Sequence, residues 1–354
     1  MSERLSIREL KSDAPANPGT YLVHAQVARS QQKKARTGTM YLEWQISDGE
    51  TQHVIRAFGD SPAYQQASGV KTGSMVEIEG HWYENGSYGV DVRDWTFRLL
   101  ESEEAEAVLA GPADLREKQL ADYAEIEGFV LGMSDPRLRA LGELFLLRFG
   151  ERFQRSGAAR NNHHARRGGL VEHVAQMMRA ASALAGVYPQ LNRDLMLAGV
   201  LFHDCGKLWE NCYAEQGFTM PYNESGEMLG HITLGIELVN KLWHDLIVSE
   251  EAADWSTMEP RSEEVRMHLL HLIASHHGQL EYGAPVVPKT PEAQALHYVD
   301  NLDAKLEMFF KGYETATALA ANVFEKVWPL PGNLVRPLGK FVEPAPLLDR
   351  IEEE

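Results

Sequence analysis

The chain has 354 residues, of which 44% are hydrophobic and 24% are charged, a composition typical of globular proteins. This composition excludes a mainly disordered chain, a collagen-like chain and a disulfide-framework protein, and the length indicates two domains or one large one. Fifty-one acidic residues against 34 lysines and arginines give a net charge of −17, which argues against indiscriminate binding of duplex DNA.

The two cysteines, Cys205 and Cys212, form no CxxC pattern, which favours a reducing compartment. The start of the chain lacks the apolar core of a signal peptide. The apolar stretch from Leu195 to Phe202 is far shorter than the ~20 residues that a membrane span needs. We therefore expect a soluble cytoplasmic protein without membrane association. The sequence leaves the oligomeric state open, a homo-oligomer included.

Residues from about 20 to 100 alternate between apolar and polar side chains in short runs, as β-strands do. The run from Met75 to Tyr83 leads into Asn85-Gly86, a dipeptide that favours a two-residue hairpin turn. About five strands in this region predict a small Greek-key barrel of the OB type. A five-stranded open sandwich would show the same pattern.

The hydrophobic spacing changes from strand-like to helical near residue 115. Glu101 to Ala110 is rich in Glu and Ala, and Gly111-Pro112 follows it, which predicts a linker that leads into a helix. The predicted organisation is an all-β OB-type domain over 1–100, a linker over 101–118, an all-α helical bundle over 119–330 and a C-terminal tail over 331–354. Residues 1–100 contain 11 basic and 12 acidic residues, so the near-neutral barrel leaves room for a nucleic-acid groove.

Histidine and aspartate residues form an ordered series in the helical half of the chain. The series is His173, His203, Asp204, His231, His276, His277 and Asp300. Imidazole suits Mn, Fe, Co, Ni and Zn, and a carboxylate can bridge two such cations. The residues fall on about five separate predicted helices, which is how a helical bundle surrounds a metal site. The series therefore predicts a metal centre, with enough donors for two metals.

The local context of these residues favours a metal centre. His203 and Asp204 close the apolar run Leu195–Phe202, where an imidazole and a carboxylate are costly unless they are paired or coordinated. A single inward histidine is more often a core residue than a ligand, and Asp300 alone could be a helix cap, with Asp303 in its place at the metal. The other histidines are expected to be ordinary surface or core residues, namely His24, His53, His81, His244, His268, His271 and His297.

These motifs resemble the HD phosphohydrolase superfamily, whose pattern is H…HD…H…H…D on a helical bundle. The segments Asn162–His173 and Leu201–Lys207 are more specifically similar to YhaM-type 3′→5′ exoribonucleases. Further similar segments are Leu229-Gly-His-Ile, Ser275–Val286 and Leu296–Lys305. The resemblance implies an HD-domain bundle after an OB domain, in agreement with the strand spacing. Arg166 departs from the pattern, because an aromatic or less basic residue is expected there.

The resemblance also implies the cofactors and the roles of single residues. It implies two divalent metal ions, with Mn²⁺ first and Fe, Co, Ni or Mg as alternatives. One ion would be held by His173, His203, Asp204 and Asp300. Asp204 would bridge to a second ion that His231 and His276 hold. The expected catalytic residues are Asp204, Lys207, which would stabilise charge on the phosphate, and His277, which would be an additional ligand or a phosphate contact.

A run of six arginines from Arg148 to Arg167, with Glu151 as its one acid, leads to the first predicted ligand. Such a basic approach suits a polyanionic substrate, although a solvated helix face would look similar. The expected substrate contacts are Arg166, Arg167, His163 and His164 near the metals, and Lys33, Lys34 and Arg36 in the first barrel hairpin. Barrel aromatics could stack unpaired bases, although about half must face the core; they are Tyr41, Trp44, Phe58, Trp82, Tyr83, Tyr88 and Trp95.

The leading hypothesis is a metal-dependent 3′→5′ exonuclease that hydrolyses single-stranded RNA, with single-stranded DNA as a second substrate, to nucleoside 5′-monophosphates. One alternative is a nucleotide phosphohydrolase or a cyclic-nucleotide phosphodiesterase, for which an oligonucleotide-binding barrel has little use. A second alternative is a nucleic-acid-binding protein with a vestigial site, which the complete donor series argues against. A di-iron centre for oxygen chemistry ranks lower.

Overall fold

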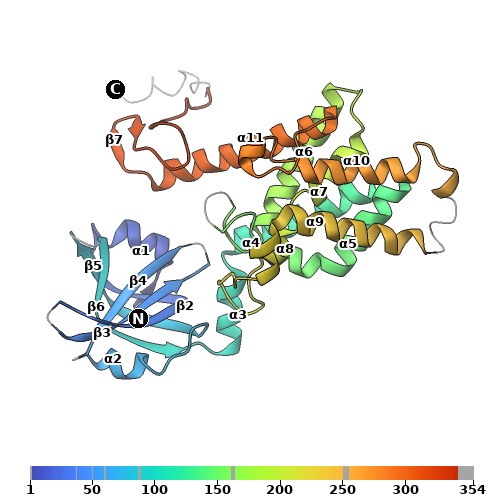
Figure 1. The fold of residues 1–354 in the computed structure, drawn as a ribbon. Coiled ribbons are helices and arrows are strands. Elements are labelled where there is room, and N and C mark those ends of the chain that lie inside the picture. The colour runs from blue at the N-terminus through green and yellow to red at the C-terminus, as the bar shows by residue number, and fades with distance from the viewer. Residues whose placement is uncertain are drawn as a thin grey trace, which may run out of the picture. The chain divides into compact units, whose positions relative to one another are not determined.

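A computed structural model describes residues 2–36, 38–49, 51–59, 61–86, 89–160, 164–249 and 255–341. The chain divides into two compact units, Met1–Asp303 and Ala304–Glu354, and each is described by itself. The first unit contains a β-domain followed by a helical domain (Figure 1).

The β-domain is an antiparallel sheet with one short parallel strand at its margin (Figure 1). Its strands are β1 (Glu3–Arg4), β2 (Gly19–Lys34), β3 (Met40–Ser47), β4 (Gln52–Phe58), β5 (Met75–Asn85) and β6 (Gly89–Leu99). Their order is β4-β3-β2-β5-β6, and β1 pairs in parallel with β2. The first half of β2 pairs with β5 and the second half with β3, so this long strand joins the two halves of the sheet.

Alternating residues of these strands form the core of the β-domain, together with α1 (Ile7–Asp13) and α2 (Pro62–Ala67). Trp44, Trp82 and Trp95 are buried in this core, so these three aromatics of the β-domain are structural. Phe58 remains 46% exposed and packs its ring 5.6 Å from that of Tyr41. Among the aromatics expected to stack bases, Tyr88 lies outside the described residues.

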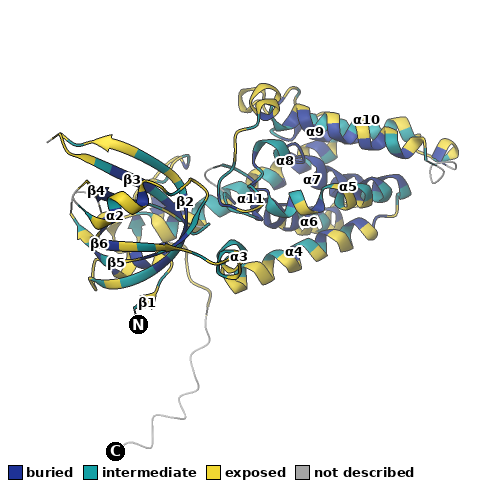
Figure 2. Ribbon diagram, turned by 90° about the horizontal axis from the view of Figure 1, so that it is seen from below, coloured by how far each residue is buried: buried dark blue, intermediate teal, exposed yellow. Residues whose placement is uncertain are grey.

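Most of the segment predicted as a linker is helical in the structure. Residues 101–118, predicted as a linker, contain α3 (Ser102–Ala110) and the first part of α4 (Ala113–Leu131). Glu101 and Glu104 form a capping box at the start of α3, and the Ala- and Glu-rich sequence favours a helix. No residue of α3 is buried, and Figure 2 shows its exposed surface. The composition that indicated a linker therefore belongs to a solvent-exposed helix.

The remaining helices of this domain surround one hydrophobic core. They are α5 (Pro136–Arg155), α6 (Gly169–Val187), α7 (Arg193–Phe202), α8 (Lys207–Glu210), α9 (Glu224–Ile247), α10 (Ser262–Ser275), the 3₁₀ helix η2 (Leu280–Tyr282) and α11 (Pro291–Thr315). Asn192 caps the N-terminus of α7, whose residues from Leu195 to Phe202 are all buried. The apolar run thus passes through the core and delivers His203 and Asp204 to its inner end.

The second unit continues α11 from Ala304 and adds a small three-stranded sheet. Its strands are β7 (Ala318–Ala320), β8 (Val323–Phe324) and β9 (Leu334–Val335). Phe324, Leu330 and Leu334 form its core, so the first residues of the predicted tail over 331–354 are part of a folded unit. Within the residues that the structure describes, no helix is both long enough and apolar enough to span a membrane.

Candidate metal centre

The structure brings the predicted donor residues together from five helices and the turns that follow them. His173 comes from α6, His231 from α9 and Asp300 from α11. The pair His203 and Asp204 directly follows α7, and the pair His276 and His277 directly follows α10. Residues separated by more than one hundred positions therefore share one site, and most of them are buried.

The first group of donor atoms surrounds one oxygen of Asp204. Nε2 of His173 lies 3.3 Å from Nε2 of His203 and 3.4 Å from Oδ1 of Asp300. Nε2 of His203 lies 3.2 Å from Oδ2 of Asp204. Neighbouring ligands around one divalent cation have spacings of about 3 Å when each metal–ligand distance is about 2.1–2.2 Å. The four side chains thus have the spacing of a shared coordination sphere.

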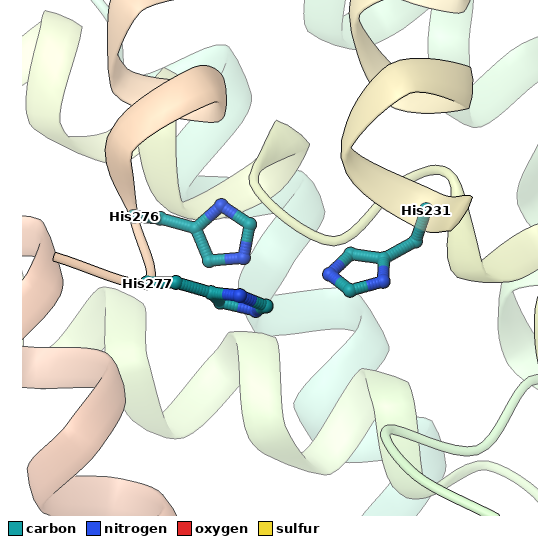
Figure 3. Close-up of side chains that lie close together, drawn as sticks. All are labelled: His231, His276 and His277. Atoms are coloured by element: carbon teal, nitrogen blue, oxygen red, sulfur yellow. The ribbon is translucent and has the colours of Figure 1, made fainter. Parts of the chain in front are cut away.

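The second group of donor atoms surrounds the other oxygen of Asp204. Oδ1 of Asp204 lies 3.5 Å from Nε2 of His231 and 3.7 Å from Nε2 of His276. These three atoms are buried, and none has a hydrogen-bond partner among the described residues. The rings of His231, His276 and His277 point toward one another (Figure 3), and their donor atoms lie within 4.8 Å of each other. Buried donors without partners are costly in a protein alone, and a bound cation relieves that cost.

Each histidine of the cluster turns its Nδ1 toward an oxygen outside the cluster. The Nδ1 distances are 2.7 Å to Asp303 Oδ2 for His173, 2.8 Å to the Val200 carbonyl for His203, 2.9 Å to Glu210 Oε2 for His231, 2.8 Å to the Ile273 carbonyl for His276 and 2.7 Å to the Tyr282 carbonyl for His277. Each Nδ1 therefore carries a proton and each Nε2 faces the cluster, which is the orientation of histidine ligands of metals.

The charges in the cluster are strongly coupled. Burial lowers the pKa of His173, but the carboxylates of Asp300 and Asp303 outweigh it and raise the pKa to about 9. Burial raises the pKa of Asp204, but His203 and Lys207 outweigh it and hold the pKa well below its ordinary value. Burial is the main cause that lowers the pKa of His276. An ionised carboxylate among imidazole nitrogens is the donor chemistry that suits a divalent transition metal, so the residues present fit a metal centre.

The structure places Asp300, the predicted ligand, and Asp303, the alternative to it, in different positions. Oδ1 of Asp300 faces Nε2 of His173 and of His203, inside the cluster. Asp303 instead contacts Nδ1 of His173 and, at 3.2 Å, Nε2 of His164, outside the cluster. Asp300 thus has the position of a ligand, and Asp303 has the position of a residue that orients a ligand.

Lys207 and Gly206 lie beside the cluster in the turn that follows Asp204. Nζ of Lys207 lies 2.6 Å from Oδ2 of Asp204. A Cβ atom at Gly206 would lie 1.9 Å from the carbonyl oxygen of His231, so glycine permits this close approach of α9. Gly230, with φ +70°, interrupts the helical backbone immediately before His231. The two glycines therefore set how α9 presents this histidine to Asp204.

Arg166 and Arg167, expected to contact the substrate, already have protein partners. The Arg166 guanidinium donates to both carboxylate oxygens of Glu172, at 2.9 and 2.5 Å. Arg167 donates to the backbone carbonyls of Ala214, Glu215 and Gly217. Both arginines thus stabilise the segments around the cluster.

The other expected substrate contacts differ in burial and in their protein partners. His164 is buried beside Asp303, with its backbone at φ +44°. His163 lies outside the described residues. Lys33 pairs with Glu43 at 2.5 Å, whereas Lys34 and Arg36 are exposed on the β-domain. The hairpin positions therefore remain available to a ligand, and His164 belongs to the interior.

Sequence reasoning missed Glu210, whose carboxylate holds His231. The contact joins residues that are 21 positions apart on two different helices, and no short motif contains both. A signal was present only in the position of Glu210 one turn after Lys207, close to the His203-Asp204 pair in sequence. Contacts that orient a donor histidine depend on how two helices pack, and a sequence pattern does not show them directly.

Comparisons with known proteins identify the domain that contains the cluster. Residues 170–305 match the HD domain model, and this region contains all six predicted ligands. The chain is 35% identical over 190 residues to the 3′-5′ exoribonuclease YhaM of Geobacillus sp. (strain WCH70), which covers 54% of each chain. It is 36% identical over 189 residues to the YhaM exoribonuclease of Bacillus subtilis (strain 168), covering 53% of this chain and 55% of the relative.

A third relative has a comparable sequence identity to this chain. The 3′-5′ exoribonuclease YhaM of Oceanobacillus iheyensis is 32% identical over 204 residues, covering 58% of this chain and 59% of the relative. The chain spans about half the length of the curated relatives it matches. These comparisons support an HD domain in this chain and its similarity to named exoribonucleases.

Proposed function

We propose that this protein is a metal-dependent 3′→5′ exonuclease that hydrolyses single-stranded RNA to nucleoside 5′-monophosphates at a dinuclear centre. The observation that carries the proposal is the position of Asp204, whose two oxygens face two separate groups of nitrogen donors. Similarity to YhaM exoribonucleases over about half the chain supports the reaction and the substrate. Single-stranded DNA is included as a second substrate, because phosphodiester hydrolysis at this centre involves no group that only RNA has.

The residues of the two groups would each hold one cation. His173, His203, Asp300 and Oδ2 of Asp204 would hold the first. Oδ1 of Asp204 would hold the second, together with His231 and His276, and His277 lies close enough to complete this group. Two bound divalent cations would supply Lewis-acid activation of the phosphodiester and of the attacking water. Mn²⁺ suits this mixture of imidazole and carboxylate ligands.

Two residues of the chain would complete the chemistry. Lys207 brings an ammonium group to the edge of the cluster, where it would neutralise charge on a bound phosphate. Burial lowers the pKa of His277, and the hydrogen bond from its Nδ1 to the Tyr282 carbonyl leaves Nε2 free of a proton. His277 would therefore act as a metal ligand through that nitrogen, and a contact with the scissile phosphate would require a proton on Nε2, which would then donate to a phosphate oxygen.

The β-domain would bind the substrate upstream of its 3′ end. The strand order β4-β3-β2-β5-β6 supports an OB-type barrel, a fold that binds single-stranded nucleic acid. The exposed Lys34 and Arg36 and the exposed ring of Phe58 are suitable contacts on this domain. A cytoplasmic location agrees with two free cysteines in the described structure.

A cleavage assay tests the proposal. The purified protein is incubated with single-stranded RNA labelled at its 5′ end, in Mn²⁺, in Mg²⁺ and in EDTA. The expected result is a ladder that shortens from the 3′ end only when metal is present, with nucleoside 5′-monophosphates as products. An RNA that stays intact under all conditions contradicts the proposal, and release of a labelled 5′ fragment in one step indicates an endonuclease instead.

A further inference from the structure

A groove of about 410 Å³ lies between the β-domain and the helical domain of the first unit. Its β-domain side includes Arg29 of β2 and Gln45 of β3, and its helical-domain side includes Arg160 and Tyr222. No acidic residue is among the described residues that line it. In a chain of net charge −17, a groove whose described lining has two arginines and no carboxylate favours an anionic ligand.

Tyr222 is the most exposed aromatic side chain of this groove. Its side chain is 76% exposed, so the ring is not part of a hydrophobic core. The guanidinium of Arg160 lies 4.2 Å from the centre of its ring, which is the geometry of a cation–π pair. The pair orients the ring at the protein surface, and an exposed ring of fixed orientation suits the stacking of an unpaired base.

Arg160 is itself held in place by the backbone. Its guanidinium donates to the carbonyls of Met220 at 3.0 Å, Glu210 at 2.7 Å and Pro221 at 3.3 Å. Within the described residues it makes no ion pair, so its positive charge is not cancelled by a carboxylate. The arginine thus orients Tyr222 and leaves a cation beside it.

Glu210 connects this pair to the metal centre. Its backbone carbonyl accepts the hydrogen bond from Arg160, and its carboxylate accepts one from Nδ1 of His231. Tyr222 also immediately precedes Asn223, the capping residue of the helix that carries His231. Glu210 therefore contacts Arg160 through its backbone and His231 through its side chain.

We propose that Tyr222, oriented by Arg160, is a stacking platform for an unpaired base of a single-stranded substrate close to the metal centre. The inference rests on the proposed exonuclease function and adds a substrate-positioning residue to it. Arg29, across the groove, would hold a backbone phosphate of the same strand. A duplex has no unpaired base to offer, so the platform would favour single strands.

Equilibrium binding tests the platform separately from catalysis. The probe is a 5′-fluorescein-labelled single-stranded RNA, followed by fluorescence anisotropy with the full chain in EDTA, where no cleavage occurs. Tyr222→Ala is expected to raise Kd by about 5- to 100-fold, the range for loss of one stacked base. Tyr222→Trp is expected to keep the wild-type Kd within about threefold, because a larger ring retains the stacking surface. Arg29→Gln is expected to reduce the slope of log Kd against log salt concentration by about the contribution of one phosphate contact.

Tyr188 provides the matched control. It is 55% exposed and follows the end of α6, about 22 Å along the helix direction from His173 at 1.5 Å per residue. Tyr188→Ala is expected to bind RNA as the wild type does. A Tyr222→Ala protein with a Kd within twofold of wild type, or a Tyr222→Trp protein as weak as Tyr222→Ala, overturns the platform. A wild-type protein that binds RNA but never shortens it overturns the exonuclease function and leaves the binding result intact.

Discussion

Asp303 accepts a hydrogen bond from Nδ1 of His173, with 2.7 Å between the ring nitrogen and Oδ2. Both side chains are buried, and Nε2 of the same ring faces His203 and Asp300. A carboxylate in this position fixes the ring and makes the free nitrogen a better donor. Asp303 therefore has the position of a residue that orients a ligand of the proposed metal centre.

The first prediction concerns this supporting role. Asp303→Asn is expected to weaken Mn²⁺ binding by about 10- to 100-fold, because the ring of His173 loses its charged partner. Asp300→Ala removes a donor from the cluster itself and is expected to weaken binding further. Isothermal titration calorimetry with Mn²⁺ measures both affinities. If Asp303→Asn weakens binding more than Asp300→Ala does, the two aspartates have been assigned in the wrong order.

The resemblance places Asp300 among the ligands, with Asp303 as an alternative, but the sequence does not predict that Asp303 is the partner of His173 Nδ1. Asp300 and Asp303 are three positions apart on one helix, so the sequence pattern places both on the same side of α11. Which one faces the cluster depends on how α11 packs against α6. Glu210 was missed for the same reason, since its partner His231 comes from another helix.

The second prediction concerns Arg166, which pairs with the buried carboxylate of Glu172. Burial raises the pKa of Glu172, but Arg166 outweighs it and the pKa falls to about 2. Arg166→Ala is expected to lower the free energy of unfolding by roughly 2–3 kcal/mol, because the buried carboxylate of Glu172 loses its main partner. The loss stays in this range because Lys118 and Gln119 still contact the carboxylate. Urea denaturation measures the loss.

The double variant Arg166→Ala/Glu172→Gln provides the control for this pair. It is expected to recover part of the lost stability, because no buried charge is left without its arginine. The sequence favoured Arg166 as a substrate contact instead. That hypothesis would be right if Arg166→Ala unfolded like the wild type and had lost affinity for RNA.

The third prediction concerns His53 in the β-domain. Burial, followed by the nearby charge of Lys11, lowers the pKa of His53 from 6.5 to about 4. The unfolded chain therefore binds a proton at higher pH than the folded one does. The contribution of His53 to stability is complete above pH 6.5 and is lost as the pH falls toward about 4. The full loss is about 3 kcal/mol, at 1.36 kcal/mol per pKa unit.

His53→Gln isolates this contribution, because glutamine does not titrate and all other groups remain. Urea midpoints of both proteins are compared across the interval from pH 6.5 to about 4. The wild type is expected to lose stability faster than the variant as the pH falls. Parallel curves for the two proteins would show that His53 protonates without cost in the folded state.

The β-domain illustrates what alternation in a sequence can and cannot predict. The strands appear in the structure, since alternating side chains need one buried face, and β5 and β6 pair as a hairpin. Asn85 pairs with Gly89, so the connection is longer than the predicted two-residue turn. The sequence did not show which aromatics face inward, and the structure buries Trp44, Trp82 and Trp95. The Glu- and Ala-rich stretch from Glu101 to Ala110 has no apolar periodicity because it forms a helix with no buried residue, so its helical structure cannot be predicted from hydrophobic spacing.

The central structural claim is that two cations share Asp204, and the metal content of purified protein tests it most directly. After loading with Mn²⁺ and removal of free metal, elemental analysis should find two ions per wild-type chain. The same analysis should find one ion for His231→Ala and none for a folded Asp204→Ala, because both oxygens of Asp204 are lost together. Two tightly held ions in Asp204→Ala, or one ion in the wild type, would contradict the claim.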